Sequence, residues 1–111
     1  MTGRMIISYF GREQEYIAAD RRLAAIERVV RERLSAGLTM YLSADGGESG
    51  RAHMTIMLTP QTHALFTYTD LPGHPDRDHT LADAVAVLRR QVDLYGGIHL
   101  DADDEPVDPV I

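Results

Sequence analysis

The stretch HMTIMLTPQTHALFTYT (residues 53–69) carries the clearest secondary-structure signal in the chain. Apolar and polar residues alternate over residues 54–58 and again over residues 65–69, which is the period-2 pattern of half-buried β-strands. Residues 60–63 (PQTH) separate the two runs, and a proline at this place favours a turn. We therefore predict an antiparallel β-hairpin here and expect the rest of the fold to pack around it.

Two amphipathic helices are predicted on either side of this stretch, because apolar residues recur there at steps of three and four. The first series is Ala19, Leu23, Ile26, Val30 and Leu34, and the second is Leu81, Val85, Leu88, Val92 and Tyr95. Gly37 stands where the first helix should stop, and Gly96 and Gly97 follow the second. Glu27 precedes Arg31 by four residues, the favourable order for an ion pair along a helix.

Three short β-prone segments complete the pattern, at residues 5–10, 38–42 and 98–100. Together these elements predict an α+β fold. We expect one antiparallel sheet of four to five strands with two helices on one face, in the order β-α-β-β-β-α with an optional final strand. Residues 1–100 are predicted to form a single domain, and residues 101–111 an acidic, flexible tail.

The composition is that of an ordinary globular domain, with 111 residues, 44% of them hydrophobic. The absence of cysteine excludes a disulfide framework and a cysteine nucleophile. No apolar run approaches the roughly 18 residues that a membrane span needs, and no secretory signal precedes the first strand. We therefore expect a cytoplasmic protein that does not associate with membranes.

The net charge of −6 is unevenly distributed along the chain. Five acids lie in the last eleven residues without a base among them: Asp101, Asp103, Asp104, Glu105 and Asp108. Direct binding of nucleic acid is not expected, because it requires a concentrated basic face. An acidic segment of this kind is instead suited to the basic cleft of a protein partner.

A histidine- and aspartate-rich loop is the main candidate for metal chemistry. His74, Asp76, Asp78 and His79 lie close together in sequence, with Asp70 nearby. Imidazole and carboxylate groups are ligands for Zn²⁺ or Ni²⁺, but no ligand-spaced pair lies on a helix. We therefore predict a solvated loop with no metal and no cofactor. No serine stands in a Gly-x-Ser-x-Gly elbow, so no catalytic residue is assigned.

Residues 54–98 resemble a HicB-type antitoxin domain. That family joins a β-hairpin to an Asp-Leu-Pro-Gly phrase, a short loop, a Thr-Leu pair and a helix that ends near Leu-Tyr. The matching residues here are Asp70-Leu71-Pro72-Gly73, Thr80-Leu81 and Leu94-Tyr95. The chain departs from the family at His74, where cysteine is common, and at Asp78-His79, where Gly-Asp is usual. Residues 1–52 have no counterpart in the family pattern.

A looser resemblance, in size, acidity and lack of cysteine, is to the immunity proteins of bacterial polymorphic toxins. Both resemblances imply a non-enzymatic antitoxin or immunity-type inhibitor that binds and blocks a partner toxin. The HicB likeness implies a small basic nuclease as that toxin. We expect the loop and the tail to make the contacts, through Asp70, His74, Asp76, Asp78, Asp103, Asp104 and Glu105.

Two alternatives stay open on the sequence alone. One is a small dimeric α+β enzyme or small-molecule-binding protein, with a pocket between the sheet and the first helix where His53 and Tyr68 would act. The other is a phage-encoded inhibitor of a host defence protein, which would also bind a protein partner. The identity of the partner and the oligomeric state, including a homodimer, are left open as well.

Overall fold

A computed structural model describes residues 2–9, 11–45, 54–69 and 79–108, and the statements below concern these ranges. This part of the chain is α+β, with two helices and six strands. In chain order they are β1 (Thr2–Tyr9), β2 (Arg12–Ala19), α1 (Asp20–Ser35), β3 (Met40–Ala44), β4 (Met54–Leu58), β5 (His63–Thr67), α2 (His79–Tyr95) and β6 (Gly97–Leu100).

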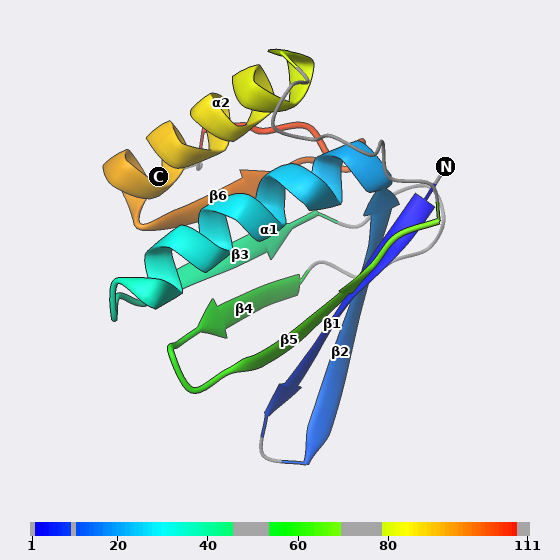
Figure 1. Cartoon of the computed structure of the whole chain (residues 1–111), viewed down its shortest axis with the longest axis vertical. Coiled ribbons are helices and arrows are strands. Elements are labelled where there is room, and N and C mark those ends of the chain that lie inside the picture. The colour runs from blue at the N-terminus through cyan, green and yellow to red at the C-terminus, as the bar shows by residue number, and fades with distance from the viewer. Residues whose placement is uncertain (1, 10, 46–53, 70–78, 109–111) are drawn as a thin grey trace.

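The six strands form two three-stranded sheets and not the single sheet that the sequence predicted (Figure 1). Sheet A has the order β2-β1-β5 and is antiparallel throughout. Sheet B has the order β4-β3-β6, and β6 runs parallel to β3. The element order is therefore also different from the prediction, with an additional strand before the first helix.

The additional strand is β2, which the sequence analysis missed. Its first four residues carry three charges and are exposed, so they lack the apolar alternation of a half-buried strand. Only Tyr16 and Ala18 alternate into the core, and Ala19 was read as the start of the helical series. Pairing with β1, from Tyr9↔Arg12 to Thr2↔Ala19, holds this segment extended, and Gly11 between the strands has a φ of 75°. Gly11 thus belongs to a tight connection between two strands and does not merely end one.

The predicted hairpin over residues 53–69 is also wrong, although both of its strands exist. Strand β4 pairs with β3, and β5 pairs with β1. The turn between them is closed by a 2.9 Å hydrogen bond from the Thr62 amide to the Thr59 carbonyl. A hairpin around this four-residue connection would set Leu58 opposite His63. Residues that pair directly point to the same side of a sheet. Because Leu58 is fully buried and His63 is exposed, such pairing would expose the core residues of β4 or bury the exposed residues of β5.

Both predicted helices are confirmed, and α1 ends as its sequence indicates. Gly37 has a φ of 76°, its amide donates to the Leu34 carbonyl, and the Leu38 amide donates to the Arg33 carbonyl. These two bonds are those of a Schellman motif, which needs a left-handed residue at this place. The predicted pair between Glu27 and Arg31 is present, with the oxygen and nitrogen 3.1 Å apart.

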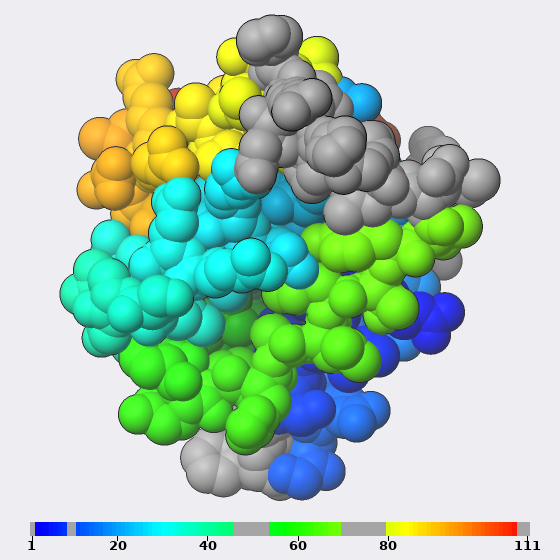
Figure 2. Space-filling model, in the orientation of Figure 1, coloured from blue at the N-terminus to red at the C-terminus, as the bar shows by residue number. Residues whose placement is uncertain are grey.

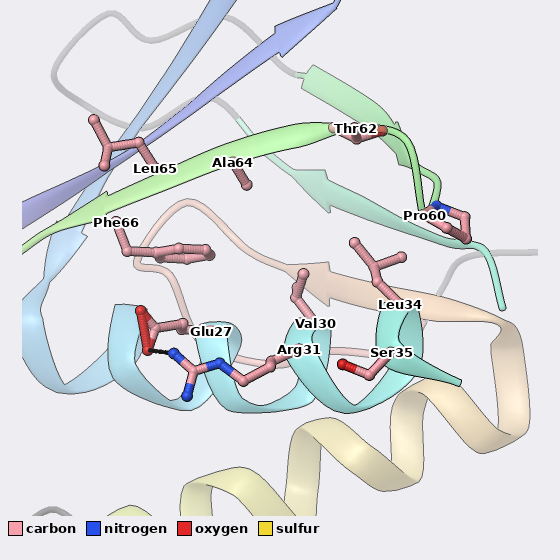
Figure 3. A pocket seen from close by; sticks show the side chains of 10 residues that line it. All are labelled: Glu27, Val30, Arg31, Leu34, Ser35, Pro60, Thr62, Ala64, Leu65 and Phe66. Atoms are coloured by element: carbon pink, nitrogen blue, oxygen red, sulfur yellow. Dashed lines mark hydrogen bonds and ion pairs between the residues drawn. The ribbon is translucent and has the colours of Figure 1, made fainter. Parts of the chain in front are cut away.

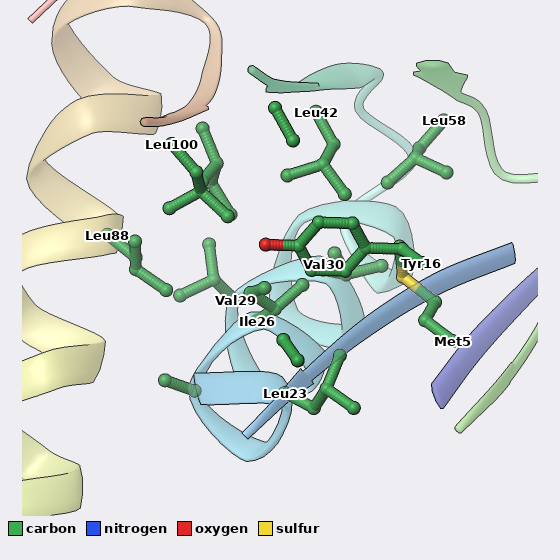
Figure 4. Packing of buried hydrophobic residues seen from close by; sticks show 14 of the residues in the cluster. Met5, Tyr16, Leu23, Ile26, Val29, Val30, Leu42, Leu58, Leu88 and Leu100 are labelled. Carbon is green, nitrogen blue, oxygen red and sulfur yellow. The ribbon is translucent and has the colours of Figure 1, made fainter. Parts of the chain in front are cut away.

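The hydrophobic core lies where α1 meets both sheets. Helix α1 packs against β1, β2 and β3, and α2 packs beside α1 and against β6. Figure 4 shows the Tyr16 ring at the centre of this core, between Met5 on sheet A and Leu42 on sheet B. Neither helix has the length and apolar character needed to span a membrane, within the ranges that the structure describes.

Candidate protein-binding surface

The acid-rich residues 101–108 form a compact turn, to which we refer below as the acidic turn. The Asp101 carboxylate organises it, because its Oδ1 accepts hydrogen bonds from the amides of Asp103 at 2.8 Å and Glu105 at 3.0 Å. Asp104 between them has a φ of 61°, a left-handed conformation that aspartate tolerates better than most residues. The backbone of this segment is therefore held in a defined conformation.

Two side-chain contacts attach the acidic turn to sheet A and α1. The buried Tyr16 hydroxyl donates a 2.5 Å hydrogen bond to the Asp104 carboxylate. Arg22 on α1 forms a 3.2 Å ion pair with Glu105, whose side chain is 65% exposed. The Tyr16 bond has a charged acceptor and a buried donor, so it is the stronger of the two attachments.

A third attachment joins the acidic turn to sheet B and α2. Gln91, only 6% exposed, donates from Nε2 to the Val107 carbonyl at 2.7 Å, and its Oε1 accepts from the His99 amide at 3.2 Å. The Val107 amide donates to the His99 carbonyl at 2.9 Å, and Pro106 bridges to Leu100. The acidic turn thus covers the outer edge of β6 and ties both sheets to the two helices.

Of the seven predicted contact residues, the structure describes the three in the acidic turn. Asp70, His74, Asp76 and Asp78 lie outside the described residues, so their position relative to the acidic turn is not defined. The acidic turn brings together Asp103, Asp104 and Glu105. Their environments differ, because Asp104 is half-buried under Tyr16 and Glu105 pairs with Arg22, whereas Asp103 is exposed. Asp103 is therefore the one best placed to contact another molecule.

A second candidate region is an open cleft of about 540 Å³ between α1 and β5. Val30 and Leu34 of α1 face Ala64 and Phe66 of β5 across it (Figure 3). The Glu27–Arg31 ion pair lies at its border. On the molecular surface, β5 is exposed between α1 and β1 (Figure 2). Sequence analysis did not single out these residues, because it treated the apolar residues of both elements as core.

The sequence left open a small-molecule pocket between the sheet and the first helix, and this cleft lies there, but Tyr68 is not among the residues that line it. His53 lies outside the described residues, so its proposed partnership with Tyr68 is not defined. The Tyr68 hydroxyl is buried and makes no hydrogen bond within the described residues. Burial, together with the negative charge of Glu27, raises the pKa of Tyr68 well above its ordinary value. The hydroxyl therefore stays protonated at neutral pH and is unsuited to act as a general base.

The side of sheet A that faces away from α1 exposes apolar residues. Ile17 and Leu65 are 49% and 59% exposed, and the strand register places both on this side, with Ile6 between them. On sheet B, Met57 is 60% exposed. Exposed apolar groups gathered on one side of a sheet commonly mark a contact surface for another molecule.

Sheet B carries an aromatic and polar cluster at the end of α2. The Tyr41 hydroxyl lies 2.9 Å from the Tyr95 carbonyl and 3.0 Å from Nε2 of His99. It can donate to the carbonyl, which caps the end of α2, and accept from the imidazole. Gly97 is required here, because a Cβ would lie 2.4 Å from the Tyr41 carbonyl oxygen. These contacts position β6 against the end of α2.

Comparison with protein-family models, with curated proteins and with solved structures found no match for this chain. Within the residues that the structure describes, no group of three or more histidine, aspartate or glutamate side chains is arranged to hold a metal ion. The candidate site is therefore defined by its own geometry: an acidic turn on one part of the surface, and on another a cleft beside an exposed strand, with one ion pair at its border.

Proposed function

We propose that this chain is a non-enzymatic inhibitor of the antitoxin or immunity type, which binds a basic partner toxin in the bacterial cytoplasm and blocks its active site. A nuclease is the favoured partner, because nuclease clefts carry the positive charge that binds phosphate. The proposal extends the HicB and immunity-protein resemblances of the sequence. Inhibition would be steric and electrostatic, with no chemistry performed by the inhibitor.

The observation that carries this proposal is the fixed geometry of the acidic turn. The Asp101 carboxylate holds its backbone, and the Tyr16–Asp104 bond and the Arg22–Glu105 pair hold two of its carboxylates. A preorganised charged surface loses less conformational entropy on binding than a flexible one. It also accelerates association with an oppositely charged partner through electrostatic steering.

The experiment begins with capture of the partner from cells of the source organism by the tagged chain, at low salt and at about 0.5 M salt, where surface electrostatics are largely screened. The captured protein is then expressed alone and together with the chain. We expect growth arrest in the first case and recovery in the second. Recovery of the chain alone, as a homodimer, would contradict the proposal and favour the ligand-binding alternative.

Asp103→Arg tests whether the acidic turn makes the contact. Asp103 is exposed, so the substitution should leave the fold intact. We expect association with the captured toxin to slow by about tenfold or more at low salt, and the difference to shrink at about 0.5 M salt. Asp93→Arg on the exposed face of α2 is the matched control, with the same change in charge. Equal rates for both variants would remove the acidic turn from the interface.

A further inference from the structure

The two edges of sheet A differ in a way that bears on binding. Edge strand β2 carries Arg12, Glu13 and Glu15. Edge strand β5 (HALFT) carries no acidic or basic side chain other than His63, and its Leu65 is 59% exposed. Natural sheets protect their free edges with charges, because an uncharged edge readily pairs with another strand. Sheet A has this protection at β2 and lacks it at β5.

No strand of the described chain covers the free edge of β5. Strand β4 is the nearest in sequence, but it pairs only with β3. The four-residue connection from Thr59 to Thr62 prevents it from pairing with β5, since buried Leu58 would then lie opposite exposed His63. Among the described strands, the backbone groups along this side of β5 therefore have no partner.

The cleft beside β5 indicates the chemistry of that strand. Its lining is mixed: apolar Val30 and Leu34 on α1 face Ala64 and Phe66 on β5 (Figure 3), and the uncharged polar residues Ser35 and Thr62 also line it. The two charged residues at its border, Glu27 and Arg31, neutralise each other at 3.1 Å. A charged side chain entering the cleft would find no unpaired opposite charge there, so charge complementarity favours an uncharged segment.

We propose that an uncharged, extended segment of the inhibited partner binds in this cleft and pairs with β5 as an additional strand of sheet A. Main-chain hydrogen bonds to β5 would supply affinity, and alternate side chains would contact the apolar residues that line the cleft. This inference rests on the proposed inhibitor function and names a second contact of the same partner. The partner would thus make an uncharged contact at the cleft in addition to an electrostatic contact at the acidic turn.

A second copy of this chain is a poorer occupant of the cleft. If β5 of a second copy paired here, its β1 and β2 would have to follow on the same side. Val30 and Leu34 of α1 border the cleft on that side. The helix would therefore clash with the complete sheet of a second copy, whereas a single strand would fit beside it. The test must therefore distinguish dimerisation through β5 from binding of a segment of the partner.

The test uses a phage-displayed library of random heptapeptides as the probe and the full chain as the target. We expect enrichment of uncharged peptides with apolar residues at alternate positions. Ala64→Lys places a charge in the cleft at an exposed position and should weaken these peptides at least tenfold. Gln14→Lys is the matched control, because Ile7 of β1 lies opposite both Gln14 and Ala64 at the two edges.

Hydrogen exchange gives a readout that does not depend on the variants. Bound peptide should slow exchange of backbone amides in β5 and leave those in β2 unchanged. Failure to enrich peptides, enrichment of charged ones, binding unaffected by Ala64→Lys, or a dimer that this variant disrupts would each overturn the proposal. If Asp103→Arg impairs toxin neutralisation while Ala64→Lys does not, the inhibitor function is supported and strand binding in the cleft is contradicted. If the peptides bind as expected but no toxin is neutralised, the inhibitor function fails and the strand-binding cleft remains, with a different partner.

Discussion

Sheets A and B contain three strands each, yet they differ in how far their strands are enclosed. In sheet B, central strand β3 has a fully alternating burial pattern, and the edge at β6 is covered by Pro106 and Val107. In sheet A, strand β5 has four of its five residues exposed, and its edge borders an open cleft. Sheet B is thus covered at its β6 edge, whereas the β5 edge of sheet A borders an open cleft.

This difference sets β5 apart from the strands that stabilise the molecule. Buried apolar contacts dominate stability, and β1 and β2 of sheet A provide them as sheet B does, whereas no residue of β5 is fully buried. An exposed strand contributes little to stability, so its residues can serve recognition without a large energetic cost. The acidic turn is the link between the two sheets, because it contacts Tyr16 on sheet A and the backbone of β6 on sheet B.

The largest effect is expected from the same substitution made in the two sheets. Leu42→Ala in sheet B removes a fully buried side chain and should lower the free energy of unfolding by about 2–5 kcal/mol. Leu65→Ala in sheet A removes one that is 59% exposed and should change it by about 0.5 kcal/mol or less. Urea denaturation of both variants measures the difference. Similar losses would mean that the sheets do not differ in this way.

A smaller effect is expected where the acidic turn joins the sheets. Tyr16→Phe deletes the hydroxyl that bonds to Asp104 and should lower the free energy of unfolding by about 1.5–3 kcal/mol, since the acceptor is charged. Asp104→Asn keeps a residue that tolerates the positive φ. We expect a double-mutant cycle between these two substitutions to give a coupling of about 0.5–3 kcal/mol.

Tyr41→Phe provides the control for this cycle. It deletes the hydroxyl that contacts the Tyr95 carbonyl and His99, neither of which takes part in the Tyr16–Asp104 bond. Its effect should add to that of Asp104→Asn without coupling. Coupling of equal size in both cycles would show that the Tyr16–Asp104 bond is not a specific link.

Elements with local signals were predictable from the sequence. The two helices follow from periodicity, the end of α1 from Gly37, and the Glu27–Arg31 pair from its spacing. The strand pairing was not predictable in the same way, because it depends on residues far apart in sequence. Strand β2 is set by its register with β1, and the separation of β4 from β5 is set by which side of each strand meets α1.

The candidate site also combines features that were evident from the sequence with features that depend on distant residues. The acidity of residues 101–108 was evident from composition, and the segment was expected to be flexible. Its compact conformation depends on Tyr16 and Gln91, which lie in β2 and α2 and carry no sequence signal for this role. A pocket between the sheet and the first helix was left open by the sequence, but the residues that line the cleft were not identified, because an exposed Ala64 and a core alanine look alike in sequence. The lack of charge in β5 was the one signal that could have identified an unprotected edge.

The smallest effect is expected in the pH dependence of the free energy of unfolding, to which His99 of sheet B contributes. Burial lowers the pKa of His99, so the folded state takes up a proton less readily than the unfolded state. The stabilisation from neutral His99 is therefore fully present above the unfolded pKa of about 6.5, and it is lost as pH falls through the lower folded-state pKa. His99→Gln should reduce the drop in urea midpoint between about pH 7.5 and pH 5.5. His63→Gln on exposed β5 is the matched control in sheet A. An equal reduction in both variants would mean that enclosure of the His99 ring in sheet B has no bearing on proton binding, and that the two sheets differ in packing alone.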